Sequence, residues 1–454
     1  MTDSAIRETY PADLQAQIIR LTAEVGCAGP VLFVMTFEGR LDPARLARAA
    51  RLLLDAEPML GCRFVAGPGR PHWRRRDDLD TTAWCLVQET ADPDMVLRQL
   101  MTPLPEHIER TIRLHLLRRP DGDTLVMWVT HMLADAYAAR QCAGLLGEIY
   151  TRLREEPDYR PETNPAVPMP DSWMRTLSFR DTLRILRRDI ADAREGRGMV
   201  HSFERDFATF TRTPAAGADF VKVRIGPNAL AGIDRAARQR GNTRNELLTA
   251  SFLRVFSDFA PRGPTAKAQV ALTIDLRRFA PPGPQLRTYS MVGMTRVTVP
   301  HAPGDPFDRT LAQVKAVLDR QKKALMGAAN PLLVRLFGWL PPRAMQAMIR
   351  GMVRKTIDRP MAPNFSNAGR AEPEALRFDG VAPQDCGLVV YPAGLPLFMV
   401  TAMEYAGTLT LTCCFQPTDL TADAVRGFLE RVVNGCPADP VPEAELNESR
   451  AAAD

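Results

Sequence analysis

The stretch that decides the fold runs from Leu125 to Tyr150 and reads LVMWVTHMLADAYAARQCAGLLGEIY. It opens with the apolar run LVMWV, typical of a buried strand, and from Tyr137 its apolar residues recur at helical spacing. His131 lies in the short turn between the two, at the edge of the expected sheet, where binding clefts often form. His131 is therefore a candidate general base, and the alternative is a partly buried structural histidine.

Asp135 follows His131 by four positions and offers two arrangements. Its carboxylate could hydrogen-bond the imidazole, or it could hold the turn by pairing with a distant arginine. A turn this short favours the second arrangement. The same spacing recurs in HAPGD, His301 to Asp305, which is rich in proline and glycine and predicts a surface turn. Spacing alone therefore does not identify a catalytic histidine.

The residues before this stretch predict strands and helices in mixed order. GPVLFVMTFEG predicts a strand from Val31 to Phe37, and Asp42 followed by Pro43 is typical of the start of a helix. GCRFVA, TAWCLVQ and the pair ERTIRLHLLRR and DTLVMWVTH predict further strands, the last two joined by a turn. RPHWRRR, from Arg70 to Arg76, is followed at once by DDLD and predicts a solvated loop.

A proline-rich segment, EEPDYRPETNPAVPMPDS, divides the chain because a helix cannot continue through it. Length alone suggests about two to three domains. We predict an N-terminal lobe over 1–172 that carries the His131 motif, a helical connection over 173–200, and a C-terminal lobe over 201–454. The tail from about 446 is expected to be disordered.

The second half has the same mixed composition. DFVKVRIG, AQVALTIDLRRF, SMVGMTRVTV and GTLTLTCCFQ predict strands, and TRNELLTASFLRVFSDF predicts a helix capped by Thr243. The uncharged run from Cys386 to Met403 is long enough to consider as a membrane span, but its prolines and glycine favour two strands joined by a turn. Strands and helices without strict alternation predict an α+β fold, a mixed α/β sandwich.

Composition excludes several classes of protein. The net charge of +5 over 454 residues is too mild for a nucleic-acid binder. The eight cysteines show no metal-ligand spacing, which predicts no metal site and reduced thiols in a cytoplasmic protein. The first residues contain no apolar segment typical of a signal peptide. No phosphate-binding loop, dinucleotide fingerprint or serine elbow competes with His131.

THMLADA resembles the HHxxxDG motif of the chloramphenicol-acetyltransferase-like superfamily. This superfamily includes nonribosomal peptide condensation domains, alcohol acetyltransferases, polyketide-associated acyltransferases and wax-ester synthases. Four further segments resemble the family in the right order along nearly the whole chain: LDPARLARAARLLLDAEPMLGCRFV, NTRNELLTASFLRVF, LTIDLRRF and NFSNAG. The motif is weak evidence alone, and the ordered set is specific for the fold.

The resemblance implies two similar lobes in a V-shaped pseudo-dimer with a central tunnel. It implies that His131 is the general base and that Asp135 is structural, paired with the arginine of LTIDLRRF, for which we choose Arg277 over Arg278. Asn367, in NFSNAG, is a candidate for contact with the tunnel or the substrate carbonyl, and equally a turn residue. No bound cofactor is implied.

The sequence departs from the family motif at two positions. Thr130 replaces the first histidine, which is not the base. Ala136 replaces the glycine after the aspartate, and it would be strained if the turn required a positive φ there.

Three functions follow from these features. The first is an acyltransferase that moves an acyl group from coenzyme A or a phosphopantetheinyl carrier protein to a hydroxyl or amine. The second is a free-standing condensation enzyme that forms an amide or ester, with its carrier protein supplied in trans. The third is a non-catalytic member that binds lipid or carrier. The basic and apolar segment 330–359 suggests a hydrophobic acceptor or peripheral membrane contact, although a surface helix with a buried face is commoner.

Overall fold

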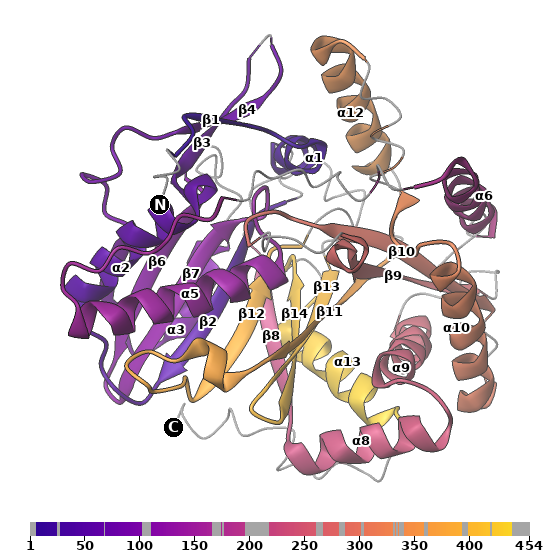
Figure 1. The fold of residues 1–454 in the computed structure, drawn as a ribbon. Coiled ribbons are helices and arrows are strands. Elements are labelled where there is room, and N and C mark those ends of the chain that lie inside the picture. Colours follow the sequence, from indigo (N-terminus) through magenta and orange to yellow (C-terminus); the bar gives the residue numbers. More distant parts are fainter. Residues whose placement is uncertain are drawn as a thin grey trace.

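The computed structural model describes most of the chain, with gaps in the sequence between these segments: 6–24, 28–67, 69–101, 110–165, 174, 177–195, 218–259, 267–280, 287–300, 304–329, 332, 335, 340–357, 362–392, 398–417 and 420–437. Figure 1 shows a mixed α/β architecture, in which helices pack against the sheets. The described strands form sheets of five, six and three strands. The predicted α+β class is confirmed.

The five-stranded sheet carries the His131 motif at one end of a central strand. Its order is β12-β2-β7-β6-β5, antiparallel except for the β5–β6 pair. The strands are β2 (Pro30–Phe37), β5 (Cys85–Glu89), β6 (Ile112–Arg119), β7 (Gly122–Thr130) and β12 (Asp385–Val390). The helices α2 (Pro43–Ala56) and α5 (Ala136–Glu155) cover one face, and α3 (Pro93–Leu100) covers the other. β7 is buried along its whole length because both of its faces are covered.

A small three-stranded sheet corrects one prediction. It consists of β1 (Thr9–Pro11), β3 (Cys62–Val65) and β4 (His72–Arg75), with β4 in the middle, and the short helix η1 (Pro58–Gly61) precedes β3. The expected solvated loop at RPHWRRR is therefore wrong. Trp73 is fully buried against the core, and Arg75 forms an ion pair of 2.5 Å with Asp55. Strand pairing and this ion pair give the basic run a structural role, which its composition alone does not indicate.

The six-stranded sheet has the order β10-β9-β11-β13-β14-β8. Its strands are β8 (Asp219–Ile225), β9 (Lys267–Asp275), β10 (Val292–Pro300), β11 (Asn364–Ala371), β13 (Phe398–Tyr405) and β14 (Thr408–Phe415). β11 runs parallel to both of its neighbours, and the other pairs are antiparallel. The helices that pack with this sheet are α8 (Pro227–Gln239), α9 (Arg244–Phe259), α10 (Phe307–Lys322) and α13 (Ala422–Asn434).

Cap residues set the starts of several helices as the sequence predicts. Asp42 accepts hydrogen bonds from the first backbone amides of α2, with Pro43 at the first helical position. Thr243 and Glu246 cap α9 reciprocally: Glu246 N donates to Thr243 Oγ1 at 3.2 Å, and Thr243 N donates to Glu246 Oε2 at 2.9 Å. These contacts fix where α9 leaves the loop after α8.

The run from Cys386 to Met403 contains two strands, as predicted, but they pair in different sheets. β12 pairs with β2 over six positions, from Asp385 opposite Thr36 to Val390 opposite Val31. β13 lies between β11 and β14 in the six-stranded sheet. β12 comes from the predicted C-terminal lobe and extends the sheet of the N-terminal lobe. The division at 1–172, 173–200 and 201–454 stays a prediction.

Three helices lie apart from the main sheets: α1 (Leu14–Ala23), α6 (Phe179–Glu195) and α12 (Pro342–Ile357). α12 packs on α1, and Met345 and Ile349 are buried there with Leu21. Met345 and Ile349, on the apolar side of α12, are thus covered by protein, and membrane contact through 330–359 stays a prediction. The tail expected to be disordered from about 446 lies outside the described residues, as does His301. Within the described segments, no helix is long and apolar enough to cross a bilayer.

Candidate active site

His131 lies in a tight turn between β7 and α5. The carbonyl of Thr130, the last residue of β7, accepts hydrogen bonds from Leu133 N at 3.0 Å and Ala134 N at 3.1 Å. Met132 and Leu133 are buried beneath this turn, whereas His131 is partly exposed. The turn therefore holds its apolar residues in the core and presents the imidazole at the end of the sheet.

The imidazole of His131 is held by its own turn. Its Nδ1 lies 3.0 Å from the carbonyl oxygen of Ala134. A carbonyl oxygen can only accept, so Nδ1 carries the proton and Nε2 carries the lone pair. Desolvation lowers the pKa of His131, and the nearby charge of Asp135 opposes part of that shift. The ring is therefore neutral at neutral pH, with a basic Nε2.

Asp135 uses both carboxylate oxygens on groups other than the imidazole. Oδ1 accepts from Ala138 N at 2.9 Å, so Asp135 is the N-cap of α5. Oδ2 accepts from Arg277 Nη1 at 2.8 Å and from Met291 N at 2.9 Å. The side chain is almost fully buried. Of the two arrangements open to Asp135, the structure has the one in which it braces the turn.

Arg277 reaches this carboxylate from the short helix η3 (Leu276–Phe279), which follows β9. Its Nη2 donates to Tyr289 O at 2.6 Å, and its Cζ lies 4.6 Å from the centre of the Tyr137 ring. Burial by itself lowers the pKa of Arg277. The carboxylates of Asp135 and Asp275 have the larger combined effect, so the pKa of Arg277 is raised. Arg278, the rival candidate, is exposed beside Phe279. Of the two arginines, Arg277 is the one that the structure joins to Asp135.

The contacts of Asp135 and Arg277 connect the two large sheets. Asp135 follows β7 of the five-stranded sheet, and Arg277 and Met291 lie between β9 and β10 of the six-stranded sheet. Ala134 also forms a backbone bridge with Tyr289. The contacts of Met291 N and Tyr289 O could not be expected from the sequence, because they are made by backbone atoms. The contact of the Tyr137 ring with Arg277 had only a weak signal in the sequence, namely that Tyr137 lies two residues after Asp135.

The two departures from the family motif leave the turn unstrained. Ala136 is the first residue of α5 and has no positive φ, so its methyl group causes no backbone strain. Thr130 is fully buried, and its Oγ1 accepts a long hydrogen bond of 3.4 Å from Met132 N. Neither replacement removes a contact of His131 or Asp135.

Asn367 lies in an irregularity of β11, away from the contacts around Asp135. Its Oδ1 accepts from Gly369 N at 2.9 Å, where Gly369 has a φ of +76°, and its Nδ2 donates to Asn245 Oδ1 at 3.3 Å. Arg140 of α5 donates to the carbonyls of Ala368 and Arg370. These contacts give Asn367 the role of a turn residue, in a segment that α5 holds. A contact with substrate stays a prediction.

The cysteines of the described residues form neither disulfides nor a metal site. The seven cysteines placed there are free, and burial raises their pKa, as for Cys62 and Cys85, where it reaches about 12. The described segments contain no group of histidine, cysteine and carboxylate side chains that could hold a metal ion.

The chain is similar to known proteins in sequence and in structure. No family model matches the sequence. Over 258 residues the chain is 20% identical to gramicidin S synthase 2 from Aneurinibacillus migulanus. That match covers 56% of this chain and 6% of the synthase, so the chain spans a small part of that protein's length.

Solved structures are similar over almost the whole chain. Polyketide synthase associated protein 5 from Mycobacterium tuberculosis has a TM-score of 0.65 at 15% identity, with 97% of this chain and 100% of that chain covered. The first condensation domain of the CDA synthetase has a TM-score of 0.64 at 17% identity, covering 96% and 98%. Trichothecene 15-O-acetyltransferase from Fusarium sporotrichioides has a TM-score of 0.68 at 14% identity, covering 94% of each chain. The chain therefore has the chloramphenicol-acetyltransferase-like fold that condensation domains share with this acetyltransferase.

Proposed function

We propose that the protein is an acyltransferase that moves an acyl group from a thioester to a hydroxyl or amine, with His131 as general base. The observation that carries this proposal is the state of the imidazole. Its Nδ1 lies 3.0 Å from the Ala134 carbonyl oxygen, which leaves Nε2 as the nitrogen with the lone pair. A neutral imidazole with a lone pair on Nε2 is the form that accepts a proton from an acceptor group.

The reaction needs one proton acceptor and no covalent acyl-enzyme. His131 Nε2 takes the proton of the acceptor hydroxyl or amine as its oxygen or nitrogen attacks the thioester carbonyl. The tetrahedral intermediate collapses by breaking the carbon–sulfur bond, and the thiolate leaves. The proton on Nε2 then returns to that sulfur, so the products are the ester or amide and a free thiol.

Asp135 and Arg277 act as positioning residues in this scheme. The carboxylate of Asp135 fixes the turn that carries His131, and its charge favours the imidazolium that forms during the reaction. Arg277 holds this carboxylate in place from the other large sheet. Catalysis by a positioned base depends on such support because small displacements of the base reduce the rate strongly.

The similarity to condensation domains and to an acetyltransferase supports a thioester donor. Coenzyme A and the phosphopantetheine arm of a carrier protein present the same thioester group, so both are proposed as donors. A carrier protein would act in trans. The central tunnel and a hydrophobic acceptor stay predictions of the resemblance, and a free-standing condensation enzyme remains the second candidate because of the likeness to the condensation domain.

The test is acyl transfer by the wild type and by His131→Ala. A panel of acyl-coenzyme A and acyl-carrier donors is offered with alcohols and amines, and thiol release is followed. We expect His131→Ala to lower the rate by about 100- to 10,000-fold, the usual contribution of a general base. His72→Ala is the matched control, because the Nδ1 of His72 also faces a backbone carbonyl, that of Arg70.

The outcomes separate the candidates. Equal turnover by wild type and His131→Ala with every active pair would show that His131 is not the base. Turnover only with carrier-bound donor and carrier-bound acceptor identifies the condensation reaction. A wild type that is inert throughout yet binds carrier protein or lipid contradicts catalysis and favours the non-catalytic member.

A further inference from the structure

The helix α6 carries an exposed apolar stripe on its outer side. Phe179 is 81% exposed, Ile190 is 52% exposed and Leu183 is 36% exposed. At about 100° per residue, these three side chains fall within roughly 40° of one another around the helix axis. Leu186, on the neighbouring part of the helix surface, packs against the main core. Single exposed apolar residues are ordinary on protein surfaces, but an aligned stripe of this kind marks a contact surface.

Arginines form a second stripe directly beside the apolar one. On the same helical projection, Arg194, Arg187, Arg180 and Arg184 occupy roughly the next 80° of the helix surface. All four are exposed. Arg184 forms an exposed ion pair with Asp181 at 3.1 Å, whereas no ion pair joins Arg180 or Arg187 to another described residue. The positive charge of this stripe is therefore largely available to a partner.

The acidic residues of α6 lie on its other side, toward the protein. Asp192 Oδ2 accepts from Gln321 Nε2 of α10 at 3.4 Å. Burial raises the pKa of Asp189, and the charge of Arg296 on β10 opposes that shift. Ile185 is buried against the protein. The helix is thus attached by its acidic and Ile185 side, which leaves the apolar and basic stripes outward.

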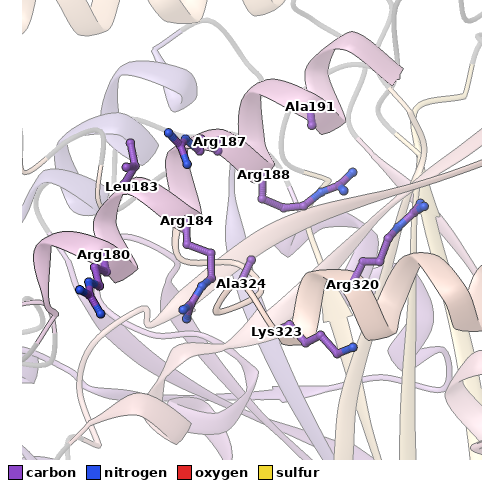
Figure 2. Close-up of a pocket in the computed structure, with 9 residues that line it drawn as sticks. All are labelled: Arg180, Leu183, Arg184, Arg187, Arg188, Ala191, Arg320, Lys323 and Ala324. Carbon is purple, nitrogen blue, oxygen red and sulfur yellow. The ribbon is translucent and has the colours of Figure 1, made fainter.

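An open pocket of about 570 Å³ lies between α6 and α10 and continues the basic stripe. Figure 2 shows that side chains from both helices line it, and six of them are cationic: Arg180, Arg184, Arg187, Arg188, Arg320 and Lys323. Asp192 and Glu195 neutralise Arg188 in part, and Glu195 lies 3.8 Å from Arg320. The cations exceed these carboxylates, so the pocket attracts anionic groups such as phosphates.

We propose that α6 is a docking surface for an anionic phospholipid membrane. Phe179, Leu183 and Ile190 enter the boundary between head groups and acyl chains, and the arginine stripe and its pocket bind the phosphates. An amphipathic helix with a basic polar side lies in the membrane interface in this way. The proposal goes beyond acyl transfer and does not depend on it. It also places membrane contact on α6 in place of the 330–359 segment.

The experiment is co-sedimentation of the full chain with vesicles. We expect binding to vesicles of roughly 3:1 phosphatidylcholine to phosphatidylglycerol, weak binding to phosphatidylcholine alone, and release at high salt. Arg180→Gln/Arg187→Gln should weaken binding by about five-fold per arginine, or about 25-fold together. Phe179→Ser/Ile190→Ser should weaken it by about ten-fold or more, because two apolar side chains no longer enter the interface.

The matched control is Arg238→Gln/Arg377→Gln, which removes the same charge at exposed positions on other elements. It should bind as the wild type does, and thermal unfolding should show that all variants are folded. The proposal fails if the control weakens binding as much as the α6 variants, or if vesicle binding is absent. It also fails if inorganic pyrophosphate or an acidic carrier protein binds the arginine stripe while vesicles do not, or if Phe179→Ser/Ile190→Ser instead dissociates a dimer.

Discussion

Asp135 shows, at the scale of single residues, how a carboxylate supports a histidine without touching its ring. Its two oxygens accept three hydrogen bonds, from Ala138 N, Met291 N and Arg277 Nη1. The ring of His131 is oriented instead by the carbonyl of Ala134, one residue before the aspartate. The resemblance to a known motif pointed to His131, Asp135 and Arg277 together, but the backbone partners had no signal in the sequence because every residue offers the same amide and carbonyl.

The pH dependence of catalysis follows from the lowered pKa of His131. Because the neutral imidazole is the proposed base, we expect activity to be lost when the pH falls through that pKa. We expect kcat/KM with an alcohol acceptor to fall on the acid side, with a midpoint below the ordinary histidine pKa of about 6.5. A pH–rate profile checks this. A limb centred above pH 6.5 would contradict the desolvated, neutral ring.

Stability should depend on the ion pair between Asp135 and Arg277. In Asp135→Asn an uncharged amide replaces the carboxylate that accepts from Arg277 Nη1 and Met291 N. The guanidinium of Arg277 then loses its buried negative partner. We expect the free energy of unfolding to fall by about 3–5 kcal/mol. Denaturant unfolding measures the change.

Asp275→Asn provides the matched control because Asp275 contacts the same guanidinium at 3.2 Å but its side chain is 47% exposed. Asparagine can still cap η3, and an exposed ion pair contributes at most about 1 kcal/mol. Equal losses in the two variants would show that burial does not set the strength of the pair.

At the scale of elements, sequence patterns located the strands and helices whose signals are local. Asp42 with Pro43, and Thr243, cap the helices that follow them, as predicted. Among the missed elements are short strands that depend on distant partners. β4 pairs with β1 on one side and with β3 on the other. The helices α3 and α10 were missed as well. The partners of β12 and β13 were equally hidden, because a strand's own residues do not say which sheet it joins.

The capping box of α9 leads to a prediction about its stability. Thr243→Ala removes the acceptor for Glu246 N and should lower the free energy of unfolding by about 1 kcal/mol. Thr421→Ala, at the start of α13, is the comparison because Thr421 caps only Ala424 N, at 3.2 Å. Urea unfolding of both variants measures the two losses. A negligible loss for Thr243→Ala would mean that packing of α9 alone fixes its first turn.

At the scale of the whole molecule, the two halves of the chain share a sheet and a hydrophobic core. The main hydrophobic core around β2, β7, α2 and α5 also contains Leu276, Tyr289 and Met291 from the second half of the chain. α3 adds ion pairs to β8, through Arg98 with Asp219 at 2.7 Å and Lys222 with Asp94 at 3.0 Å. The two halves therefore fold as parts of one molecule.

Cutting the chain between the halves should leave them together. With a protease site inserted after Pro168, we expect both fragments to co-elute in size-exclusion chromatography after cleavage and to separate only in denaturant. The shared core and the β12–β2 pairing hold them. Separate elution in native buffer would show that each half is independently folded.

β12 comes from the second half of the chain but belongs to the five-stranded sheet, and this placement restricts how the two sheets can move relative to each other. The backbone passes from one large sheet to the other three times: after α5, between β11 and β12, and between β12 and β13. Between the last two passages, β12 pairs with β2 of the five-stranded sheet over six residues. The ion pair between Asp135 and Arg277 also joins the two sheets. A hinge-like separation of the two sheets would have to stretch the connections on both sides of β12 and break the ion pair between Asp135 and Arg277. We therefore expect the position of His131 relative to the six-stranded sheet to change little.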